Sequence, residues 1–384
     1  MKKLLCVLAL AVATALPVCA KASVDTAQSY CVINGATGEI VSEKNADQRM
    51  PMASTTKIMT AYTALKNSKL DDIVTVSQNA QNQEGSGMYI EAGSKFYMED
   101  LLYGLMLNSG NDAAVAIAEY IGGGSCEKFV DMMNKEAWTL GAGDTMFCNP
   151  NGLPSPSHYT TAKNLAEITR NAMQLPEFRK IVATKDRTVW QAPQQNVDGM
   201  SVIPEKSYIL HNHNRLLSTY DGAIGVKTGY TEAAGRCLVS AAERNGMMFI
   251  AVTLNDNDDW NTHTQLLDEA FKKYHPGVLA KKGEIIKEIE IDGNKYTFSA
   301  ADDCVIPLKN NEKNRVIADV NLADRLNIPI NKGEKVGYVE YSCGGKVYAR
   351  VDVISDNEIR TAGKYRLKNS FYELWKNVWD FFLV

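Results

Sequence analysis

Apolar residues recur at three- and four-residue spacings in several stretches of the chain, which is the pattern of amphipathic or buried helices. The clearest stretch is residues 54–67, where Ile58, Met59, Tyr62 and Leu65 fall on one helical face. The same spacing, with Ser, Thr or Gly at the boundaries, predicts further helices at residues 98–107, 113–121, 126–140, 161–173 and 266–274.

Short apolar runs between these helices predict strands. Residues 30–33 and 39–42 flank Asn34-Gly35-Ala36-Thr37-Gly38, and we expect a hairpin because Asn and Gly tolerate the left-handed backbone of a tight turn. Neighbouring antiparallel strands are predicted at residues 224–231, 238–242 and 247–254. Residues 176–215 are mixed in character and predict no element.

The pattern changes after Pro276. Alternating apolar and polar segments, separated by Asp-Gly, Lys-Gly and Gly-Gly turns, predict strands at residues 285–291, 295–298, 316–320, 335–341 and 346–353. Nothing in this region groups nucleophiles, bases or metal ligands. We therefore expect a main domain at residues 25–275 and a small all-β domain at residues 276–363, a division that a mature length of about 360 residues also favours.

The start of the chain has the layout of a secretory signal peptide at residues 1–22. A basic start precedes an apolar run from Leu4 to Val18, and cleavage is expected after Ala20 or Ala22. A lipoprotein signal is not expected, because Val18 stands where such a signal needs a small residue. The mature protein is therefore expected to be exported and extracytoplasmic.

The last segment, residues 364–384, is amphipathic. One helical stripe carries its large apolar side chains, which are Phe371, Leu374, Trp375, Val378, Trp379 and Phe382. The segment is too short and too charged to span a bilayer, and Trp and Phe favour the membrane interface. We expect a helix that attaches the protein to the outer face of the cytoplasmic membrane; the alternative is a helix packed on the β domain.

Composition excludes some classes of function. The chain has 41 Lys and Arg against 45 Asp and Glu, a net charge of -4, and cleavage after Ala20 removes Lys2 and Lys3 to give -6. No basic block remains in the globular body, so no nucleic-acid partner is expected. The five histidines have no cysteine or acidic partner at zinc-motif spacing, and we expect no metal and no cofactor.

Six cysteines remain after processing. An even number in an exported chain permits disulfides, yet the spacings are wide and no close pair recurs. Pairing and free buried thiols therefore both stay open for Cys31, Cys126, Cys148, Cys237, Cys304 and Cys343.

Ser54 and Lys57 begin the first predicted helix three residues apart, which places a hydroxyl and an amine on one face about a turn apart. A serine hydroxyl is a weak nucleophile at neutral pH. Lys57 can accept its proton only if burial or a second cation favours the neutral amine. Taken alone, the pair is more often a helix cap followed by a solvated lysine.

Two further clusters of polar residues offer the other groups that such a reaction needs, which are a proton relay, a peptide-binding amide and a second cation. Between two predicted helices, the Ser109 hydroxyl can relay a proton, and the Asn111 amide has both a donor and an acceptor for a peptide substrate. The alternative without function is an ordinary loop between the two helices, in which Asn111 or Asp112 caps the second helix.

The second cluster lies in the strand at residues 224–231. There Lys227 supplies a cation, Thr228 can bind a carboxylate, and Gly229 lets another backbone come close, although a charged strand end is the commoner meaning of such a tripeptide. The motifs Ser-x-x-Lys, Ser-Gly-Asn and Lys-Thr-Gly in this order are together a strong signal.

With these motifs the chain resembles the D-alanyl-D-alanine carboxypeptidases among the low-molecular-mass penicillin-binding proteins. The likeness covers residues 29–275 and is clear at residues 53–61, 100–114 and 225–231, in Asn149-Pro150-Asn151-Gly152-Leu153 and in His158-Tyr159. The resemblance implies an α+β fold with a β-lactamase/transpeptidase-like antiparallel sheet flanked by helices.

The resemblance also implies acyl transfer from a peptidoglycan stem peptide that ends in D-Ala-D-Ala. In this family's chemistry Ser54 is the nucleophile, Lys57 is the general base and Ser109 passes a proton to the leaving amine. The backbone N–H groups of Ser54 and Tyr230 form the oxyanion hole. β-Lactam antibiotics acylate the same serine and inhibit.

For substrate binding, the resemblance implies that Asn111 orients the peptide and that Lys227 and Thr228, beside Gly229, hold the terminal carboxylate. Some relatives carry an arginine shortly after the last strand of the core, but residues 256–261 contain none. Either Lys227 and Thr228 suffice, or an arginine elsewhere contributes, such as Arg236.

Three rival functions fit parts of the same pattern. A β-lactamase needs an acidic residue to activate water, and Glu167 lies in what is predicted to be an ordinary helix. A transpeptidase would share the acyl-enzyme, since only the acceptor differs. A non-catalytic wall-binding protein could keep the scaffold, but the intact motifs argue against it.

Overall fold

The computed structural model describes residues 26–195, 201–202, 206–291, 293–309, 312, 315–322, 325–326, 329–360 and 365–366. The expected signal peptide at residues 1–22 lies outside the described residues, and so does the expected tail at 364–384 apart from Tyr365 and Arg366. Those two residues form β20 (Tyr365–Arg366), which pairs with β17 (Arg325–Leu326). Within the described part of the chain, no helix has the length and apolar character needed to cross a bilayer.

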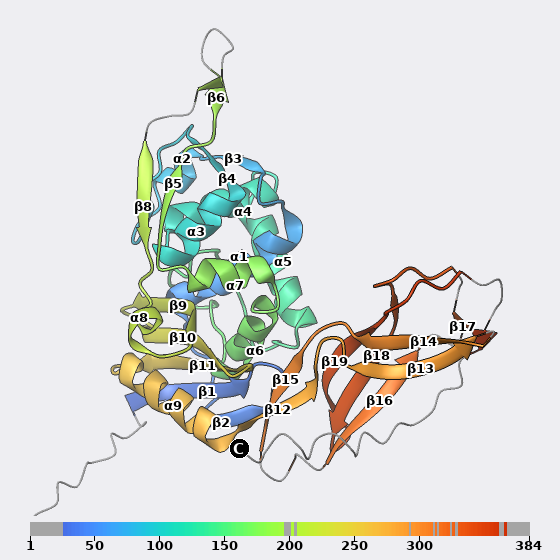
Figure 1. The fold of residues 1–384 in the computed structure, drawn as a ribbon. Helices are drawn as coiled ribbons and strands as arrows, with labels where there is room; N and C mark the ends of the chain where they lie inside the picture. The colour runs from blue at the N-terminus through green and yellow to red at the C-terminus, as the bar shows by residue number, and fades with distance from the viewer. Residues whose placement is uncertain are drawn as a thin grey trace, which may run out of the picture.

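A five-stranded antiparallel sheet forms the base of the main domain (Figure 1). Its strands, in spatial order, are β2 (Ile40–Lys44), β1 (Ala27–Asn34), β11 (Met247–Asp256), β10 (Gly235–Arg244) and β9 (Ala223–Thr231). β10 and β11 are buried over most of their length because helices cover both faces, so their sequences are nearly continuous apolar runs. The predicted hairpin at the start and the three predicted later strands are confirmed.

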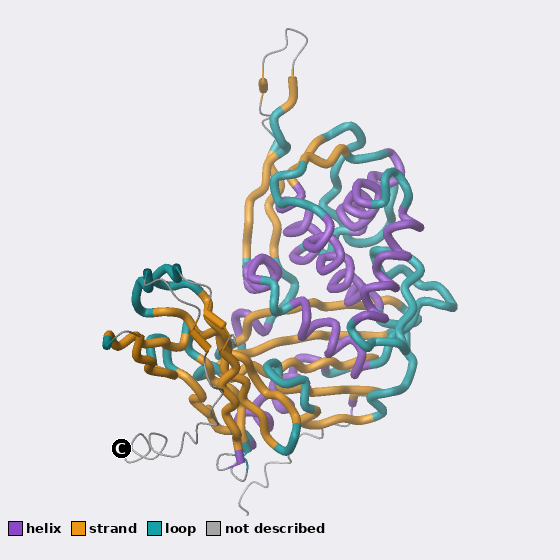
Figure 2. Tube along the Cα trace, turned by 90° about the vertical axis from the view of Figure 1, so that its right-hand side faces the viewer, coloured by secondary structure: helices purple, strands orange, loops and turns teal. Residues whose placement is uncertain are grey.

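Helices cover this sheet on both faces (Figure 2). α9 (Asp259–Lys273) packs on one face, and on the other lie the buried α1 (Lys57–Asn67) and α6 (Ala162–Ala172). The remaining helices are α2 (Gln78–Gln81), α3 (Met98–Leu107), α4 (Asn111–Ile121), α5 (Cys126–Thr139), α7 (Pro176–Ala183) and α8 (Leu216–Thr219). The helices predicted within residues 54–274 are all present, with small changes at their ends, whereas the helix predicted at residues 364–384 stays a prediction.

α9 is the exception, since it begins seven residues before the predicted start at Leu266. Apart from Trp260, its first two turns are polar and carry no apolar periodicity, yet His263 is fully buried in them. The His263 ring lies 2.5 Å from the Ser240 hydroxyl and 3.0 Å from that of Thr253. Polar contacts to the sheet, rather than apolar periodicity, hold this end of the helix.

Residues 176–215, for which the sequence predicts no element, contain α7 and a protruding hairpin of β5 (Asp186–Trp190) and β8 (Ser207–His211). Arg187 fastens the hairpin to α3, because its guanidinium lies 3.9 Å from the centre of the Tyr103 ring and pairs with Glu99 and Asp100. Shorter strands are β3 (Ile73–Thr75), β4 (Lys95–Tyr97), β6 (Gln194–Gln195) and β7 (Ser201–Val202).

The C-terminal part is a small all-β domain with its own apolar core, as predicted. Its antiparallel sheet has the order β13 (Ile285–Ile291), β14 (Asn294–Ala300), β19 (Lys346–Ser355), β18 (Lys335–Cys343) and β16 (Val316–Leu322). A two-stranded antiparallel sheet of β12 (His275–Ala280) and β15 (Cys304–Leu308), not predicted from the sequence, lies against the first hairpin of the main domain. There Lys309 pairs with Glu39, and Asn34 donates to the Pro307 carbonyl at 3.3 Å.

The six cysteines whose pairing the sequence leaves open all lie in the described part of the chain, and all are free thiols. Cys31, Cys237 and Cys343 are buried, and Cys148 is exposed. Hydrophobic packing and hydrogen bonds therefore stabilise the described residues without a disulfide.

Candidate active site

Ser54 lies in a single 3₁₀ turn, Ala53–Thr56, that leads directly into α1. The hydroxyls of Thr55 and Thr56 donate to the carbonyls of Met52 and Ala53 at 2.6 and 2.8 Å, and these bonds explain why the turn forms here. Lys57 is the first residue of α1, and its Nζ lies 2.9 Å from Ser54 Oγ. The predicted spacing of the hydroxyl and the amine is confirmed.

Lys57 Nζ has two other neighbours. It lies 2.7 Å from Asn111 Oδ1 and 2.6 Å from the Asn151 carbonyl. Asn111 Nδ2 donates to the Glu84 carbonyl at 2.6 Å, which fixes Oδ1 as the atom that faces the lysine. Both neighbours can only accept, so a neutral Lys57 gives them its two N–H groups and turns its lone pair toward the Ser54 hydroxyl.

Burial is the main reason that the pKa of Lys57 falls well below its ordinary value. The side chain is fully enclosed, and the nearby Lys227 lowers the pKa further by repulsion, whereas Asp112 opposes the shift. The second cation expected from the sequence is thus present, but desolvation is the larger cause. Burial also lowers the pKa of Lys227, to about 7.

The loop between α3 and α4 forms the second side of the site. Ser109 has a left-handed backbone (φ 57°) and is almost fully buried, and no hydrogen bond of its hydroxyl occurs within the described residues. Gly110 occupies the N-cap position of α4, so neither Asn111 nor Asp112 is the cap. Asp112 instead accepts hydrogen bonds from the Met88 and Ile90 amides and fastens residues 84–90 beside Asn111.

β9 forms the third side. Lys227 is buried and donates to the Thr228 carbonyl at 2.9 Å. Gly229 packs on the 3₁₀ turn that carries Ser54, since a Cβ atom at this position would stand 3.0 Å from Ser54 N and 3.1 Å from Thr55 N. Tyr230, the next residue, is 64% exposed. The predicted close approach at Gly229 is confirmed.

Direct contacts therefore join Ser54, Lys57, Asn111 and Gly229. Ser109 and Thr228 lie in the adjoining segments, and within the described residues no hydrogen bond links their hydroxyls to Ser54 or Lys57. Asn151 is the residue that sequence reasoning missed. Its contribution is a backbone carbonyl, and only its place in the Asn149–Leu153 segment marks it in the sequence.

Arg236, the arginine that the sequence leaves open, is the second residue of β10 and lies opposite Tyr230 of β9. Its guanidinium donates to Asp259 Oδ1 at 2.8 Å and lies 5.9 Å from the centre of the Trp260 ring. Its side chain is 42% exposed, whereas that of Asp259 is 4% exposed. Asp259 thus fixes one edge of a guanidinium that has further N–H groups to donate.

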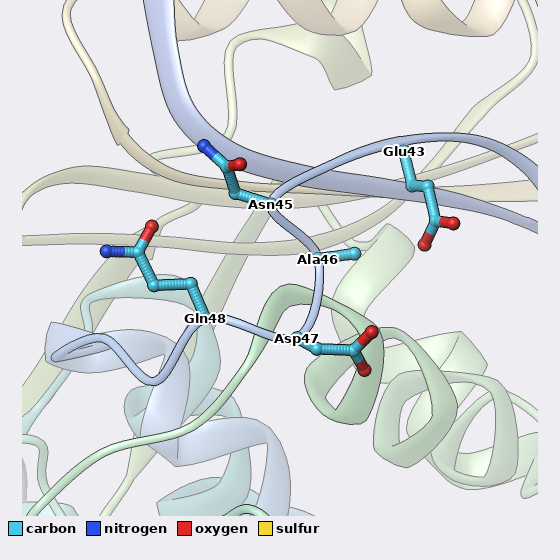
Figure 3. Close-up of a pocket in the computed structure, with 5 residues that line it drawn as sticks. All are labelled: Glu43, Asn45, Ala46, Asp47 and Gln48. Carbon is cyan, nitrogen blue, oxygen red and sulfur yellow. The ribbon is translucent and has the colours of Figure 1, made fainter.

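Two other features lie outside this cluster. An open polar hollow is lined by residues 43 and 45–48 and contains none of the predicted site residues (Figure 3). Glu167, the acid considered as a water-activating base, accepts hydrogen bonds from Arg170 and Asn171 within α6. In the described part of the chain, no three His, Cys, Asp or Glu side chains gather as a metal would require.

The family model of D-alanyl-D-alanine carboxypeptidases matches residues 17–258. The chain belongs to the D-alanyl-D-alanine carboxypeptidase family. Enzymes of this family are serine hydrolases that act through an acyl-enzyme. A second family model, the C-terminal domain of penicillin-binding protein 5, matches residues 274–361.

Individual relatives agree with this assignment. D-alanyl-D-alanine carboxypeptidase DacF of Bacillus subtilis is 31% identical over 349 residues, which are 88% of this chain and 87% of the relative. The crystal structure of carboxypeptidase DacD from Francisella tularensis is similar with a TM-score of 0.60 and 30% identity, over 88% of this chain and 94% of that one. The Streptomyces K15 DD-transpeptidase structure has a TM-score of 0.59 and 34% identity, over 64% of this chain and 97% of that one.

Proposed function

We propose that Ser54 is the nucleophile of this carboxypeptidase and that Lys57 is its general base. The observation that carries the proposal is the position of Lys57 Nζ, which touches Ser54 Oγ and two groups that can only accept hydrogen bonds. Since burial favours the neutral amine, the free lone pair faces the proton that must be removed.

In the proposed reaction Ser54 Oγ attacks the carbonyl of the penultimate D-alanine while its proton passes to Lys57. The oxyanion of the tetrahedral intermediate accepts hydrogen bonds from the Ser54 and Tyr230 amides. The C–N bond then breaks, the departing amine takes a proton from the Ser109 hydroxyl, which regains one from Lys57, and D-alanine leaves. Water hydrolyses the resulting ester and restores the Ser54 hydroxyl.

Substrate binding is proposed to use the groups around this centre. Asn111 orients the peptide amide with its Nδ2 group, which has a second N–H besides the one that it donates to the Glu84 carbonyl. Lys227 and Thr228 hold the terminal carboxylate, whose charge favours the protonated form of Lys227. Arg236 is proposed as a third ligand of the carboxylate, because it lies across the strand pair from Tyr230 with N–H groups to spare.

A second acyl acceptor is a real alternative to water. The Streptomyces K15 relative is named a DD-transpeptidase, and a transpeptidase needs the same acyl-enzyme. A β-lactamase reaction is disfavoured, because Glu167 is bound by Arg170 within α6 and the carboxylate of Asp112 is engaged by the Met88 and Ile90 amides. Added D-amino acids as acceptors would separate transfer from hydrolysis.

Export and membrane attachment are also proposed from the sequence, with the main domain at residues 25–275, the β domain at 276–363 and the two end segments as predicted. The experiment is sedimentation of the mature chain with anionic vesicles, beside the same chain ending at residue 363. Binding of the longer protein alone supports attachment through residues 364–384. Equal recovery of both in the supernatant contradicts it.

The test of the general base is Lys57→Arg, with Lys66→Arg as a control at an exposed position near the end of α1. Arginine keeps the positive charge but stays protonated, so we expect release of D-alanine from a D-Ala-D-Ala peptide to fall by about 1000-fold or more. The control should retain wild-type activity. Activity of the Lys57 variant within tenfold of wild type would contradict the proposed base.

A further inference from the structure

The peptide unit that joins Ala53 to Ser54 has its two polar groups in very different surroundings. The Ala53 carbonyl accepts the Thr56 hydroxyl proton at 2.8 Å. No hydrogen bond from the Ser54 amide occurs within the described residues, although that amide is one of the two proposed oxyanion donors. Because a trans peptide unit is planar, with C=O and N–H pointing in opposite directions, whatever holds the carbonyl also aims the amide.

Thr56 is itself held by a buried histidine. Its Oγ1 lies 2.7 Å from His158 Nε2, and the backbone N–H of Cys148 donates to His158 Nδ1 at 3.0 Å. Since Nδ1 accepts, the ring proton must lie on Nε2, and it is donated to the Thr56 hydroxyl. The Thr56 proton is then free to go to Ala53, so four groups form one directed chain of hydrogen bonds.

The surroundings keep His158 in this state. The residue is 3% exposed, and burial lowers its pKa to about 4, so the ring is neutral at physiological pH. Its ring also stands edge-on to Phe147, with 5.9 Å between the ring centres. Neutral, enclosed and oriented from both nitrogens, the ring has little freedom to turn.

Two backbones confine the peptide unit from outside. A Cβ at Gly152 would stand 2.1 Å from the Ala53 oxygen and 2.9 Å from Ser54 N, and one at Gly229 would stand 3.0 Å from Ser54 N. Ala53 has a left-handed backbone (φ 47°), which an alanine adopts only when its neighbours hold it there. The loop that carries Gly152 also carries His158, so one segment both confines and orients this unit.

We propose that His158 is a positioning residue for the oxyanion hole: it orients the Thr56 hydroxyl, which holds the Ala53 carbonyl and so aims the Ser54 N–H at the developing oxyanion. Each bond in the chain also polarises the next, which makes the Ser54 N–H a stronger donor. The inference rests on the proposed roles of Ser54 and its amide, and it adds two residues that never touch substrate.

The test uses the matched pair Thr56→Val and Thr56→Ser in the full mature protein. Two quantities are measured, the rate of acylation by a penicillin and the infrared stretching frequency of the acyl-enzyme carbonyl, labelled with ¹³C. A carbonyl with weaker hydrogen bonds absorbs at higher frequency. We expect Thr56→Val to slow acylation by about 10- to 100-fold and to raise the frequency, since loss of a complete oxyanion donor costs about 100- to 1000-fold.

Thr56→Ser keeps the hydroxyl and should match wild type in both measurements. If the valine variant does not fold, the same comparison is made between His158→Gln, which keeps an N–H for Thr56, and His158→Leu, which does not. A residue with only a structural role would lower the melting temperature and leave the carbonyl frequency unchanged. An unchanged frequency together with acylation within twofold of wild type would overturn the proposal.

Failure of the His158 proposal can be told apart from failure of Ser54 as the nucleophile. If Ser54→Ala still forms a penicillin adduct, the nucleophile is misassigned, whatever the Thr56 variants do. If Ser54→Ala forms none while the Thr56 pair behaves alike, only the relay through His158 is wrong.

Discussion

Gly229 of β9 lies directly against the amide of Ser54, with only 3.0 Å between that nitrogen and the place of a Cβ atom at residue 229. Gly229 does not have a left-handed backbone, so an alanine would be opposed by space alone: its Cβ would force the neighbouring backbone to give way by a few tenths of an ångström. The turn that carries Ser54 and the strand that carries Lys227 can approach this closely only because residue 229 has no side chain.

The first prediction follows from this contact. Gly229→Ala should push β9 away from the turn that carries Ser54 and misplace both proposed oxyanion donors, so acylation by penicillin should slow by about 100-fold or more. The measurement is the second-order rate of adduct formation, with Gly143→Ala as the control. A Cβ at Gly143 would meet only the Trp138 ring at an ordinary 3.5 Å, and that variant should react like wild type. Equal rates for the two variants would refute the close-approach argument.

A second prediction concerns the carboxylate of the substrate. Removing a charged donor costs about 1.5–3 kcal/mol, so Arg236→Leu should lower kcat/KM by about 10- to 100-fold for a peptide with a free C-terminal carboxylate. The corresponding peptide amide should be affected far less, because it lacks the charge that Arg236 would meet. The control is Arg244→Leu, at the far end of the same strand, where the side chain faces Asp221 and Asp268.

The ratio of kcat/KM for acid and amide decides the role of Arg236. A ratio that stays at the wild-type value in Arg236→Leu would show that Lys227 and Thr228 bind the carboxylate without it. A ratio that falls in both arginine variants would indicate a general effect of charge instead of a specific ligand.

A third prediction concerns stability in acid. Burial lowers the pKa of His263 to about 3, whereas a histidine in an unfolded chain titrates near 6.5. Between these values the unfolded chain binds a proton that the folded chain does not, so stability rises with pH and is lost as the pH falls below 6.5. One such group contributes up to about 1.4 kcal/mol per pH unit.

The variant that tests this rise of stability with pH is His263→Gln, which cannot take up the proton in the folded or the unfolded state. Urea unfolding at pH 4, 5 and 6 should show a shallower dependence of stability on pH than in wild type, by about 1 kcal/mol per pH unit. His275→Gln, at an exposed position, should keep the wild-type slope. Parallel slopes for the His263 variant and wild type would argue that this histidine does not titrate as described.

The sequence predicts the proximity of Ser54 and Lys57 and the three motifs because each is local. Ser54 and Lys57 are one helical turn apart, and Lys227 and Gly229 are neighbours on one strand, so spacing alone determines which groups face each other. Asn151 is different. Its carbonyl reaches Lys57 from 94 positions away, and a backbone carbonyl leaves no residue-specific trace in a sequence.

The fold differs from the prediction where polar side chains, rather than apolar ones, hold an element in place. The start of α9 has buried polar side chains such as His263 in place of an apolar stripe, so periodicity places its beginning too late. The β5–β8 hairpin is fastened to α3 through Arg187, whose partners Glu99 and Asp100 lie 88 and 87 residues earlier in the chain. Long-range polar contacts of this kind follow from the tertiary structure and cannot be read from local pattern.

The most direct test of the central assignment is mass spectrometry of the mature protein after incubation with penicillin, run beside Ser54→Ala. Free D-alanine is assayed in parallel with a D-Ala-D-Ala peptide. We expect one covalent adduct on the peptide that contains Ser54, release of D-alanine by wild type, and neither in the variant. A folded wild type that forms no adduct, or a Ser54→Ala protein that still forms one or still releases D-alanine at the wild-type rate, would contradict the assignment of Ser54 as the nucleophile.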